Sequence, residues 1–368
     1  MAGRIVLFGA TGYTGRLTAE ALVARGQQPL LAARDGDRLA RLAAELGGGL
    51  DTAVADVSQP ETVTALVGEG DVLVSTVGPF VKWGDAAAEA AIAARAHYLD
   101  STGEPPFIRR VFEHYGPQAE RAGIGMLTAF GYDWVPGNLA AALALRDAGP
   151  DAVRVDTGYF VTGAAGAGSF SGGTKASVAG VATEPAFAYR DGRLRTVRTA
   201  DRYRSFAMRG RELPAVTVGA SENFALPKTH PGLREVNSYL GWLGPLSRPM
   251  QAFSLIGSGA MKVPGVRAMS SRLADRFVRG STGGPGAEER ARAGSYIVAE
   301  AYDAVGAKLA EAHVTGVDPY TFTAGILAWG ARRVAADGML ASGALGPDGA
   351  FGLDELEAGC REAGLTRA

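Results

Sequence analysis

The sequence predicts a two-domain α/β protein, in which a doubly wound parallel sheet comes first and a second domain of the α+β class follows. Three observations lead to this prediction. A glycine triplet lies between a short apolar strand and a helical segment near the start of the chain. Six apolar strand segments then alternate with helical segments as far as residue 129. Beyond residue 152 the pattern changes to half-exposed strands with polar alternation.

A glycine-rich turn at residues 9–15 is the strongest functional signal in the chain. Residues 5–8 have the length of a buried strand, and residues 16–25 place apolar side chains on one helical face. A dinucleotide-binding loop requires this order of strand, turn and helix, although the spacing here is G-x-x-G-x-x-G. The glycines are expected, in order, to end the strand, to admit a pyrophosphate, and to let the helix pack closely. A turn without a ligand is the alternative. The predicted cofactor contacts are Gly9, Thr11, Gly12, Tyr13, Thr14 and Gly15.

The residue after the second strand bears on the choice of cofactor. Residues 29–33 form an apolar strand that ends in Arg34. An acidic residue here would bind the ribose 2′-hydroxyl of NAD, whereas a planar guanidinium suits the 2′-phosphate of NADP. We therefore predict NADPH. Asp35, the nearest acidic residue, lies one position after the place where it would bind the ribose 2′-hydroxyl of NAD. The alternative is that Arg34 is a solvated loop residue without a ligand. Asp56, after the third strand at residues 52–55, is expected either to bind the adenine amino group or to serve as a turn residue.

Three more strands, at residues 71–77, 97–100 and 123–129, end in polar or glycine-rich loops. Ligands of doubly wound sheets bind at the carboxyl ends of the strands, so these loops are expected to surround the cofactor. The Gly-Pro pair after the fourth strand is expected near the nicotinamide ribose. The cofactor contacts predicted here are Val77, Gly78, Pro79, Phe80, Ser101, Gly103 and Glu104.

The length of 368 residues predicts two domains. We expect a Rossmann dinucleotide-binding domain at residues 1–150 and an α+β substrate and dimerisation domain at residues 151–317. The remainder, residues 318–368, is expected to return to the first domain as helices at residues 319–336 and 354–363. A homodimer through the second domain's sheet is a further expectation. The strands expected in the second domain span residues 153–161, 194–208, 216–220, 296–304 and 308–314.

Composition excludes several classes of protein. The net charge of −1 gives no support to a nucleic-acid partner. One cysteine, Cys360, and four scattered histidines without an H-E-x-x-H motif predict no metal site. The chain lacks the Tyr-x-x-x-Lys pair of short-chain dehydrogenases, a G-x-S-x-G nucleophile elbow and a P-loop lysine. Hydrolase and kinase functions therefore have no support.

The N-terminal residues do not read as a signal sequence, so a cytoplasmic protein is expected. Residues 239–263 are apolar but are interrupted by proline and charged residues, too often for a membrane span. We expect these residues to form helices that wall a substrate pocket. A peripheral contact with lipid or an acyl carrier is the alternative.

Four motifs resemble those of a known family. The sequences GATGYTG at residues 9–15, VGPF at 77–80, YLDSTGE at 98–104 and GYDWVP at 131–136 occur in this order. Together they resemble the saccharopine dehydrogenase-like reductases, with the trans-acting enoyl reductases of actinobacterial polyketide and lipid pathways as the closest branch. The resemblance is specific over residues 4–140 and general beyond. It implies NADPH as cofactor, and hydride transfer to an activated C=C or C=N bond.

The fourth motif departs from this family, which often has Phe-Asp-Ser-x-Pro there. Tyr132 adds a hydroxyl and Trp134 adds bulk, both of which can reshape the pocket, so the resemblance does not fix the substrate. The predicted catalytic residues are Tyr132, Asp133 and Lys175, with Glu104 as a further possible proton donor. Each has an ordinary alternative: packing for Tyr132, a helix cap for Asp133, and a surface position or phosphate contact for Lys175.

The sequence therefore predicts an NADPH-dependent reductase of an enoyl bond in a polyketide, lipid or other secondary-metabolite intermediate, either free or carrier-bound. A C=N reductase of the saccharopine type is the first alternative, and its carboxylated substrate would need several arginines. A non-catalytic dinucleotide-binding sensor or partner subunit is the second alternative. The arginines available for a carboxylated substrate are Arg190, Arg193, Arg195 and Arg198.

Overall fold

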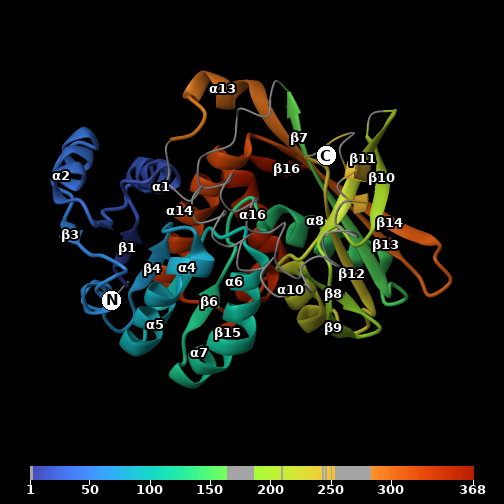
Figure 1. Cartoon of the computed structure of the whole chain (residues 1–368), viewed down its shortest axis with the longest axis horizontal. Coiled ribbons are helices and arrows are strands. Elements are labelled where there is room, and N and C mark those ends of the chain that lie inside the picture. Colours follow the sequence, from blue (N-terminus) through green and yellow to red (C-terminus); the bar gives the residue numbers. More distant parts are fainter. Residues whose placement is uncertain are drawn as a thin grey trace. The chain divides into compact units, whose positions relative to one another are not determined.

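The computed structural model describes residues 3–163, 186–208, 210–242, 244, 247–249, 251–252 and 283–368. The chain divides into two compact units (Figure 1). Unit 1 comprises Met1–Val135 and Pro319–Gly364, and unit 2 comprises Pro136–Asp318 and Leu365–Ala368. Lys175 and most of residues 239–263 lie outside the described residues. None of the described helices combines the length and hydropathy needed to cross a membrane.

Unit 1 is built on a parallel sheet with the strand order β15-β6-β5-β4-β1-β2-β3. Strands β1, β2 and β4 are buried along their whole length. Such continuous apolar strands are expected when helices cover both faces of a parallel sheet, which is the doubly wound fold predicted from the sequence. Its described strands are β1 (Ile5–Phe8), β2 (Leu30–Ala33), β3 (Thr52–Val54), β4 (Val72–Ser75), β5 (His97–Asp100), β6 (Gly125–Leu127) and β15 (Gly343–Ala344).

The seventh strand, β15, was not predicted. It is two residues long and contains a glycine, so it has no apolar run that a sequence pattern could reveal.

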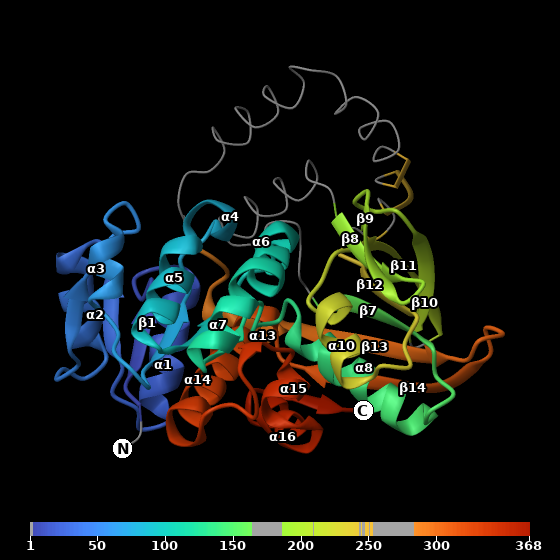
Figure 2. The same cartoon turned by 90° about the horizontal axis from the view of Figure 1, so that it is seen from below.

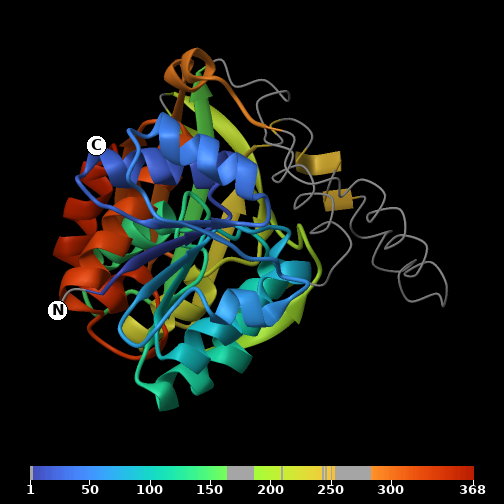
Figure 3. The same cartoon turned by 90° about the vertical axis from the view of Figure 1, so that its left-hand side faces the viewer.

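Helices lie on both sides of this sheet (Figure 3). The helix expected after β5 is continuous over residues 105–122 but contains one π-helical turn, η1. The helices that precede the second unit are α1 (Tyr13–Ala24), α2 (Gly36–Glu45), α3 (Pro60–Thr64), α4 (Phe80–Trp83), α5 (Asp85–Ala94), α6 (Pro105–Arg110), η1 (Val111–Tyr115) and α7 (Gly116–Ala122).

The C-terminal helices belong to unit 1. Helix α14 (Pro319–Asp337) lies beside α1 (Figure 2), and its buried residues include Phe322, Ile326 and Trp329. It is followed by α15 (Pro347–Phe351) and α16 (Leu353–Glu362). The last residues do not continue as helix: β16 (Leu365–Arg367) pairs with strand β14 of unit 2. The expectation that residues 318–368 return entirely to the first domain is corrected at this end.

The boundary between the units also differs from the expected residue 150. Helix α8 (Val135–Ala148) begins at the boundary and lies almost wholly in unit 2. Its Asn138 Nδ2 donates to Ser221 Oγ at 3.0 Å, and a Cβ on Gly137 would lie 1.9 Å from the Tyr159 hydroxyl. Ser221 and Tyr159 are distant from α8 in the sequence, so the pattern of apolar and polar residues does not show that this helix packs in unit 2.

Unit 2 contains a mixed sheet with the strand order β10-β11-β12-β7-β13-β14-β16, and β8 pairs with β12 and β9. Strands β8 and β12 were not predicted, and the expected strand at 194–208 is two strands, β9 and β10. The described helices besides α8 are α10 (Glu222–Thr229) and α13 (Ala287–Arg292). The described strands are β7 (Arg154–Gly163), β8 (Ala186–Arg190), β9 (Arg193–Val197), β10 (Tyr203–Met208), β11 (Arg211–Val218), β12 (Glu235–Leu240), β13 (Ala293–Tyr302) and β14 (Lys308–Gly316).

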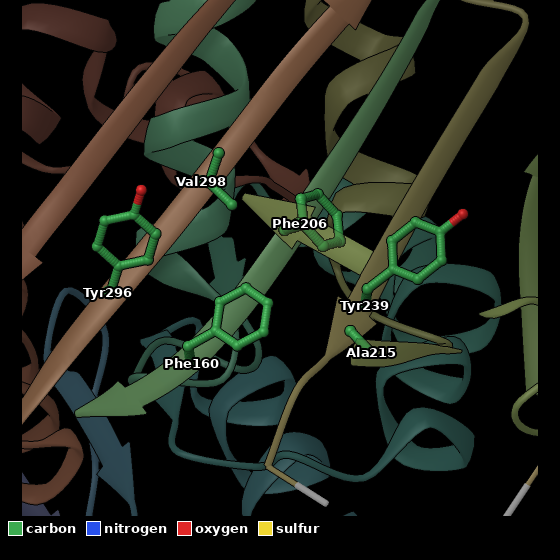
Figure 4. Packing of buried hydrophobic residues seen from close by; sticks show 6 residues of the cluster. All are labelled: Phe160, Phe206, Ala215, Tyr239, Tyr296 and Val298. Atoms are coloured by element: carbon green, nitrogen blue, oxygen red, sulfur yellow. The ribbon is translucent and has the colours of Figure 1, made fainter. Parts of the chain in front are cut away.

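The face of this sheet carries an aromatic cluster that joins five strands (Figure 4). Phe206 packs edge-on against both Phe160 and Tyr239, with ring centroids 5.8 and 5.5 Å apart. Its members are Phe160, Phe206, Ala215, Tyr239, Tyr296 and Val298. Because the strands come from distant parts of the sequence, burial of these rings stabilises the tertiary pairing as well as each strand.

Candidate functional site

The glycine-rich turn of unit 1 has a distinct reason for each glycine. Gly9 has a φ of +91°, and a Cβ there would lie 2.7 Å from Thr76 Oγ1. A Cβ on Gly15 would lie 2.1 Å from the Gly9 carbonyl oxygen, so only glycine lets α1 approach the turn this closely. A Cβ on Gly12 would meet only that same oxygen, at 3.2 Å. This contact is tight, so packing already disfavours a side chain at position 12, and the close approach of a pyrophosphate is the further reason predicted for this glycine.

The start of α1 suits an anionic group. Gly12 is the N-cap residue, so no side chain caps the helix, and the first turn contains no acidic residue. The helix dipole and the amide groups at this end attract phosphate oxygens. Tyr13 packs edge-on against Tyr320 of α14, with ring centroids 5.2 Å apart. The turn is thus held between β1 and α14 and fits the pyrophosphate of a dinucleotide.

The end of β2 fits the adenosine side of such a cofactor. Arg34 is exposed there. The Asp35 carboxylate accepts a hydrogen bond from Arg38 N at 3.0 Å and so caps α2, which is its role in this structure. Arg38 Nη2 donates to the Thr11 carbonyl oxygen at 3.3 Å. A hollow of about 130 Å³ next to it is lined by Thr11, Arg16, Arg38, Arg41, Leu42 and Glu45.

Arg38 was not singled out from the sequence. The available signal was its position in the first turn of α2, the helix that begins two residues after Arg34. Its contact with the glycine-rich turn makes it a candidate for the same phosphate as Arg34.

Asp56 has the structure of a turn residue. Its Oδ1 accepts hydrogen bonds from both the N–H and the hydroxyl of Ser58 at 2.8 Å. The Ser58 amide and hydroxyl hold the pKa of the Asp56 carboxyl below its usual value. Of the two alternatives left open by the sequence, the turn role therefore has direct support, and contact with adenine stays a prediction.

The loops after β4 and β5 are joined by Glu104. Its Oε1 accepts from Phe80 N and its Oε2 from Val81 N, each at 2.9 Å. Glu104 is only 4% exposed, and its carboxylate caps the start of α4. The sequence predicted Glu104 as a cofactor contact and possible proton donor; the structure directs both carboxylate oxygens to the backbone instead. Val77, Gly78 and Pro79 precede this cap, and Ser101 and Gly103 stand in the loop beside it.

The loop after β6 carries Tyr132 and Asp133. Tyr132 is buried, and its backbone N–H donates to Thr323 Oγ1 of α14 at 3.0 Å. Thr323 was not expected to contribute, because its role depends on the return of a helix almost two hundred residues later. A Cβ on Gly103 would lie 2.7 Å from Asp133 Oδ2, so this glycine permits the carboxyl group to lie against the β5 loop.

Asp133 is half-buried, and its buried Oδ1 has no hydrogen-bond partner among the described residues. Burial raises its pKa to about 7. The carboxyl does not cap α8, which was its ordinary alternative. A carboxyl group that is partly protonated at neutral pH can donate a proton, and such groups are typical of active sites.

The structure therefore brings most of the predicted residues of unit 1 to the carboxyl edge of one sheet. Strands β4, β5 and β6 are neighbours, and their following loops contain the predicted contacts at 77–80, 101–104 and 132–133. Lys175 lies outside the described residues.

The arginines proposed for a carboxylated substrate are largely engaged elsewhere. Arg190 pairs with Asp201 at 2.7 Å, and Arg198 pairs with the same carboxylate at 3.4 Å. Arg195 pairs with Asp191 at 2.5 Å. Arg193 is exposed at the beginning of β9. These ion pairs reduce the charge available to an anionic ligand.

Comparison with known proteins agrees with this geometry. Residues 5–127 match the family described as the saccharopine dehydrogenase NADP binding domain. The matched region is similar to that NADP-binding domain, and it includes the glycine-rich turn, Arg34 and the loops after β4 and β5.

Two mycobacterial proteins are similar to part of this chain. A Mycobacterium tuberculosis protein is 37% identical over 179 residues, which cover 47% of this chain and 43% of that protein. A trans-acting enoyl reductase of Mycobacterium leprae is 39% identical over 140 residues, which cover 37% of this chain and 34% of the relative. The chain thus spans less than half the length of these relatives.

The solved structure of apo saccharopine dehydrogenase (L-Glu forming) from Saccharomyces cerevisiae covers the whole chain. The two share a TM-score of 0.57 and 13% identity, with 100% of this chain and 99% of that one aligned. The similarity establishes the fold of the chain, a Rossmann-type sheet and a second mixed-sheet unit.

Proposed function

We propose that this chain is an NADPH-dependent reductase that transfers hydride to the activated C=C bond of a polyketide, lipid or other secondary-metabolite intermediate, either free or bound to an acyl carrier. The observation that carries the proposal is the Asp133 carboxyl group. Its Oδ1 is buried and has no hydrogen-bond partner among the described residues, and it lies at the carboxyl edge of a sheet that belongs to the region matching an NADP-binding domain. The name of the Mycobacterium leprae relative supports an enoyl substrate.

Each residue of the edge has a task in this reaction. NADPH supplies the hydride when it is bound. The chain must hold the dinucleotide, for which the uncapped start of α1 and the guanidinium of Arg34 are suited. It must then deliver a proton to the carbon that becomes negatively charged. Asp133, protonated in part at neutral pH, is the donor we assign, and burial of its Oδ1 keeps it from exchanging that proton freely with water.

A C=N reductase is the second candidate, because reduction of an imine needs the same hydride and the same proton donor. A saccharopine-type substrate would carry several carboxylates. Three of the four arginines that could bind them already pair with Asp191 or Asp201. This observation favours an uncharged or thioester substrate over an amino acid.

The first experiment is a titration of NADPH and NADH by tryptophan fluorescence, with Arg34→Ala as the variant. Loss of a charged hydrogen bond to the 2′-phosphate should weaken NADPH by about 1.5–3 kcal/mol and leave NADH nearly unchanged. Arg121→Ala is the matched control, because Arg121 is equally exposed but lies at the end of α7. Equal weakening of both cofactors by Arg34→Ala would reject the phosphate role.

The second experiment is a screen for NADPH oxidation against α,β-unsaturated thioesters and cyclic imines, with wild type and Asp133→Asn. Turnover of thioesters that falls at least tenfold in Asp133→Asn, with unchanged NADPH affinity, supports the proposal. Turnover of imines alone would select the second candidate. NADPH binding with no turnover in either class, also when carrier-bound thioesters are supplied, would favour a non-catalytic dinucleotide sensor.

A further inference from the structure

The three loops that form the carboxyl edge of unit 1 come from neighbouring strands. Ser75 at the end of β4 lies opposite Asp100 at the end of β5, and Leu99 lies opposite Leu127 of β6. Beyond these pairs the regular strand pairing ends, and backbone bonds such as Ser101 N to the Ser75 carbonyl oxygen at 3.4 Å and Phe130 N to the Asp100 carbonyl oxygen at 2.7 Å hold only the first residue or two of each loop. Other contacts must therefore fix the spacing of the loops if Asp133 is to keep one position.

Asp100 supplies the contact between the second and third loops. Its side chain is fully buried, and Oδ1 accepts hydrogen bonds from Thr102 N and Ala129 N, each at 2.9 Å. Its carbonyl oxygen accepts from Phe130 N at 2.7 Å. Ala129 has a φ of +58°, a conformation that is costly for a residue with a Cβ. The bonds from Asp100 therefore hold the β6 loop in a turn that it would not adopt unaided.

Glu104 supplies the contact between the first and second loops. Its own backbone N–H donates to Thr102 Oγ1 at 3.1 Å, while its carboxylate receives the Phe80 and Val81 amides. Thr102 thus binds both acids, through its N–H to Asp100 and its Oγ1 to Glu104. The result is a continuous chain of hydrogen bonds from Val81 to Ala129 that crosses all three loops.

We propose that Asp100 and Glu104 are positioning residues, which tie the loops after β4, β5 and β6 together and so hold the Asp133 carboxyl group against Gly103 for proton transfer. The catalytic part of this statement rests on the proposed function. Neither acid is assigned contact with the substrate, because their described hydrogen bonds all go to the chain itself.

The cost of these side chains supports a specific role. A buried carboxylate is expensive to desolvate, and an apolar side chain would fill the same volume at lower cost. Burial raises the pKa of Asp100 to about 6, against the opposing effect of the Ala129 and Thr102 amides. Since Oδ1 alone accepts both amides, asparagine can replace Asp100 without losing either bond. Alanine cannot.

This difference defines the test. Hydrogen exchange of peptides covering 101–104 and 129–134 is measured by mass spectrometry, without cofactor or substrate, in wild type, Asp100→Asn and Asp100→Ala. Asp51→Ala serves as control, since Asp51 is an exposed residue next to β3. Exchange in both peptides should accelerate on the order of tenfold in Asp100→Ala, and remain near wild type in Asp100→Asn and in the control. Unchanged exchange in Asp100→Ala would overturn the proposal.

A second readout separates positioning from stability. On the substrate class found in the screen, Asp100→Ala should lower kcat on the order of tenfold, keep the NADPH dissociation constant within about twofold, and be rescued by Asp100→Asn. If Asp100→Ala does not fold, Thr102→Val is used, because it removes only the Oγ1 acceptor of Glu104 N. It should accelerate exchange at residues 80–81 and 104; unchanged exchange there would overturn the proposal.

The two proposals fail in different ways. A wild-type protein that binds no NADPH would refute the reductase function while the exchange measurements still report on the hydrogen bonds. If wild type binds NADPH and turns over substrate, and Asp100→Ala has the same kcat as wild type, only the positioning role is refuted.

Discussion

Replacing Asp133 by asparagine should change how the stability of unit 1 depends on pH. Burial raises the pKa of the Asp133 carboxyl from 3.8 to about 7. The folded state therefore binds this proton more tightly than the unfolded state. The resulting stability is fully present below the unfolded pKa and is lost as the pH rises through about 7. Asparagine has nearly the same shape and does not titrate, so it removes this loss.

The size of the effect follows from the shift. About three pKa units at about 1.36 kcal/mol each give a limit of about 4 kcal/mol over the whole range. Between pH 5 and pH 8 about two of these units are crossed, so the advantage of Asp133→Asn over wild type should grow by about 2–3 kcal/mol. Asp100 titrates in both proteins and cancels from the comparison.

The measurement is urea unfolding of both proteins at pH 5 and pH 8. Three of the four tryptophans, Trp83, Trp134 and Trp329, lie in unit 1, so their fluorescence reports mainly on the unit that contains Asp133. Asp51→Asn, which changes an exposed carboxylate, is the control and should show no pH-dependent difference. If Asp133→Asn differs from wild type by the same amount at both pH values, the pKa of Asp133 is not raised on folding and the assignment of the proton donor loses its basis.

Two further predictions concern turnover. The kcat/KM of wild type should fall as the pH rises above about 7, because the protonated form of Asp133 is lost; Asp133→Asn should lack this limb, and a variant that retained it would point to another acid. Thr323→Val removes the acceptor of the Tyr132 N–H, so it should lower kcat severalfold with little change in NADPH affinity. An equal loss of cofactor binding would show that Thr323 supports the fold of the site more generally.

The strands and helices of unit 1 were largely predictable, because the sheet is covered on both faces. Buried parallel strands appear as short apolar runs, and the six predicted strands correspond to β1–β6. The two-residue strand β15 has no such run. In unit 2 the pattern was weaker, since one strand, β12, joins β7 in parallel and β11 in antiparallel pairing. Which strands pair in a mixed sheet depends on contacts that no local pattern contains.

The residues of the candidate site also fall into those that the sequence could assign and those that it could not. Residues whose role is local, such as the glycines of the first turn, could be assigned from their neighbours in the chain. Residues whose role depends on another loop could not. The sequence predicts Glu104 as a cofactor contact, and it does not show that Phe80 and Val81 also donate their amides to this carboxylate. Thr323 and Arg38 were missed for the same reason.

Asp100 and Asp133 show how neighbouring loops of this edge can give the same side chain different tasks. Both lose water on folding, and this raises the pKa of each. Asp100 receives two backbone amides, which favour its ionised form, and its pKa is about 6. Asp133 receives none among the described residues, and its pKa is about 7. At neutral pH the first is mostly an anion suited to accepting hydrogen bonds, while the second is protonated in part and can donate a proton. Divergent environments of this kind are how a single residue type comes to serve as both scaffold and acid.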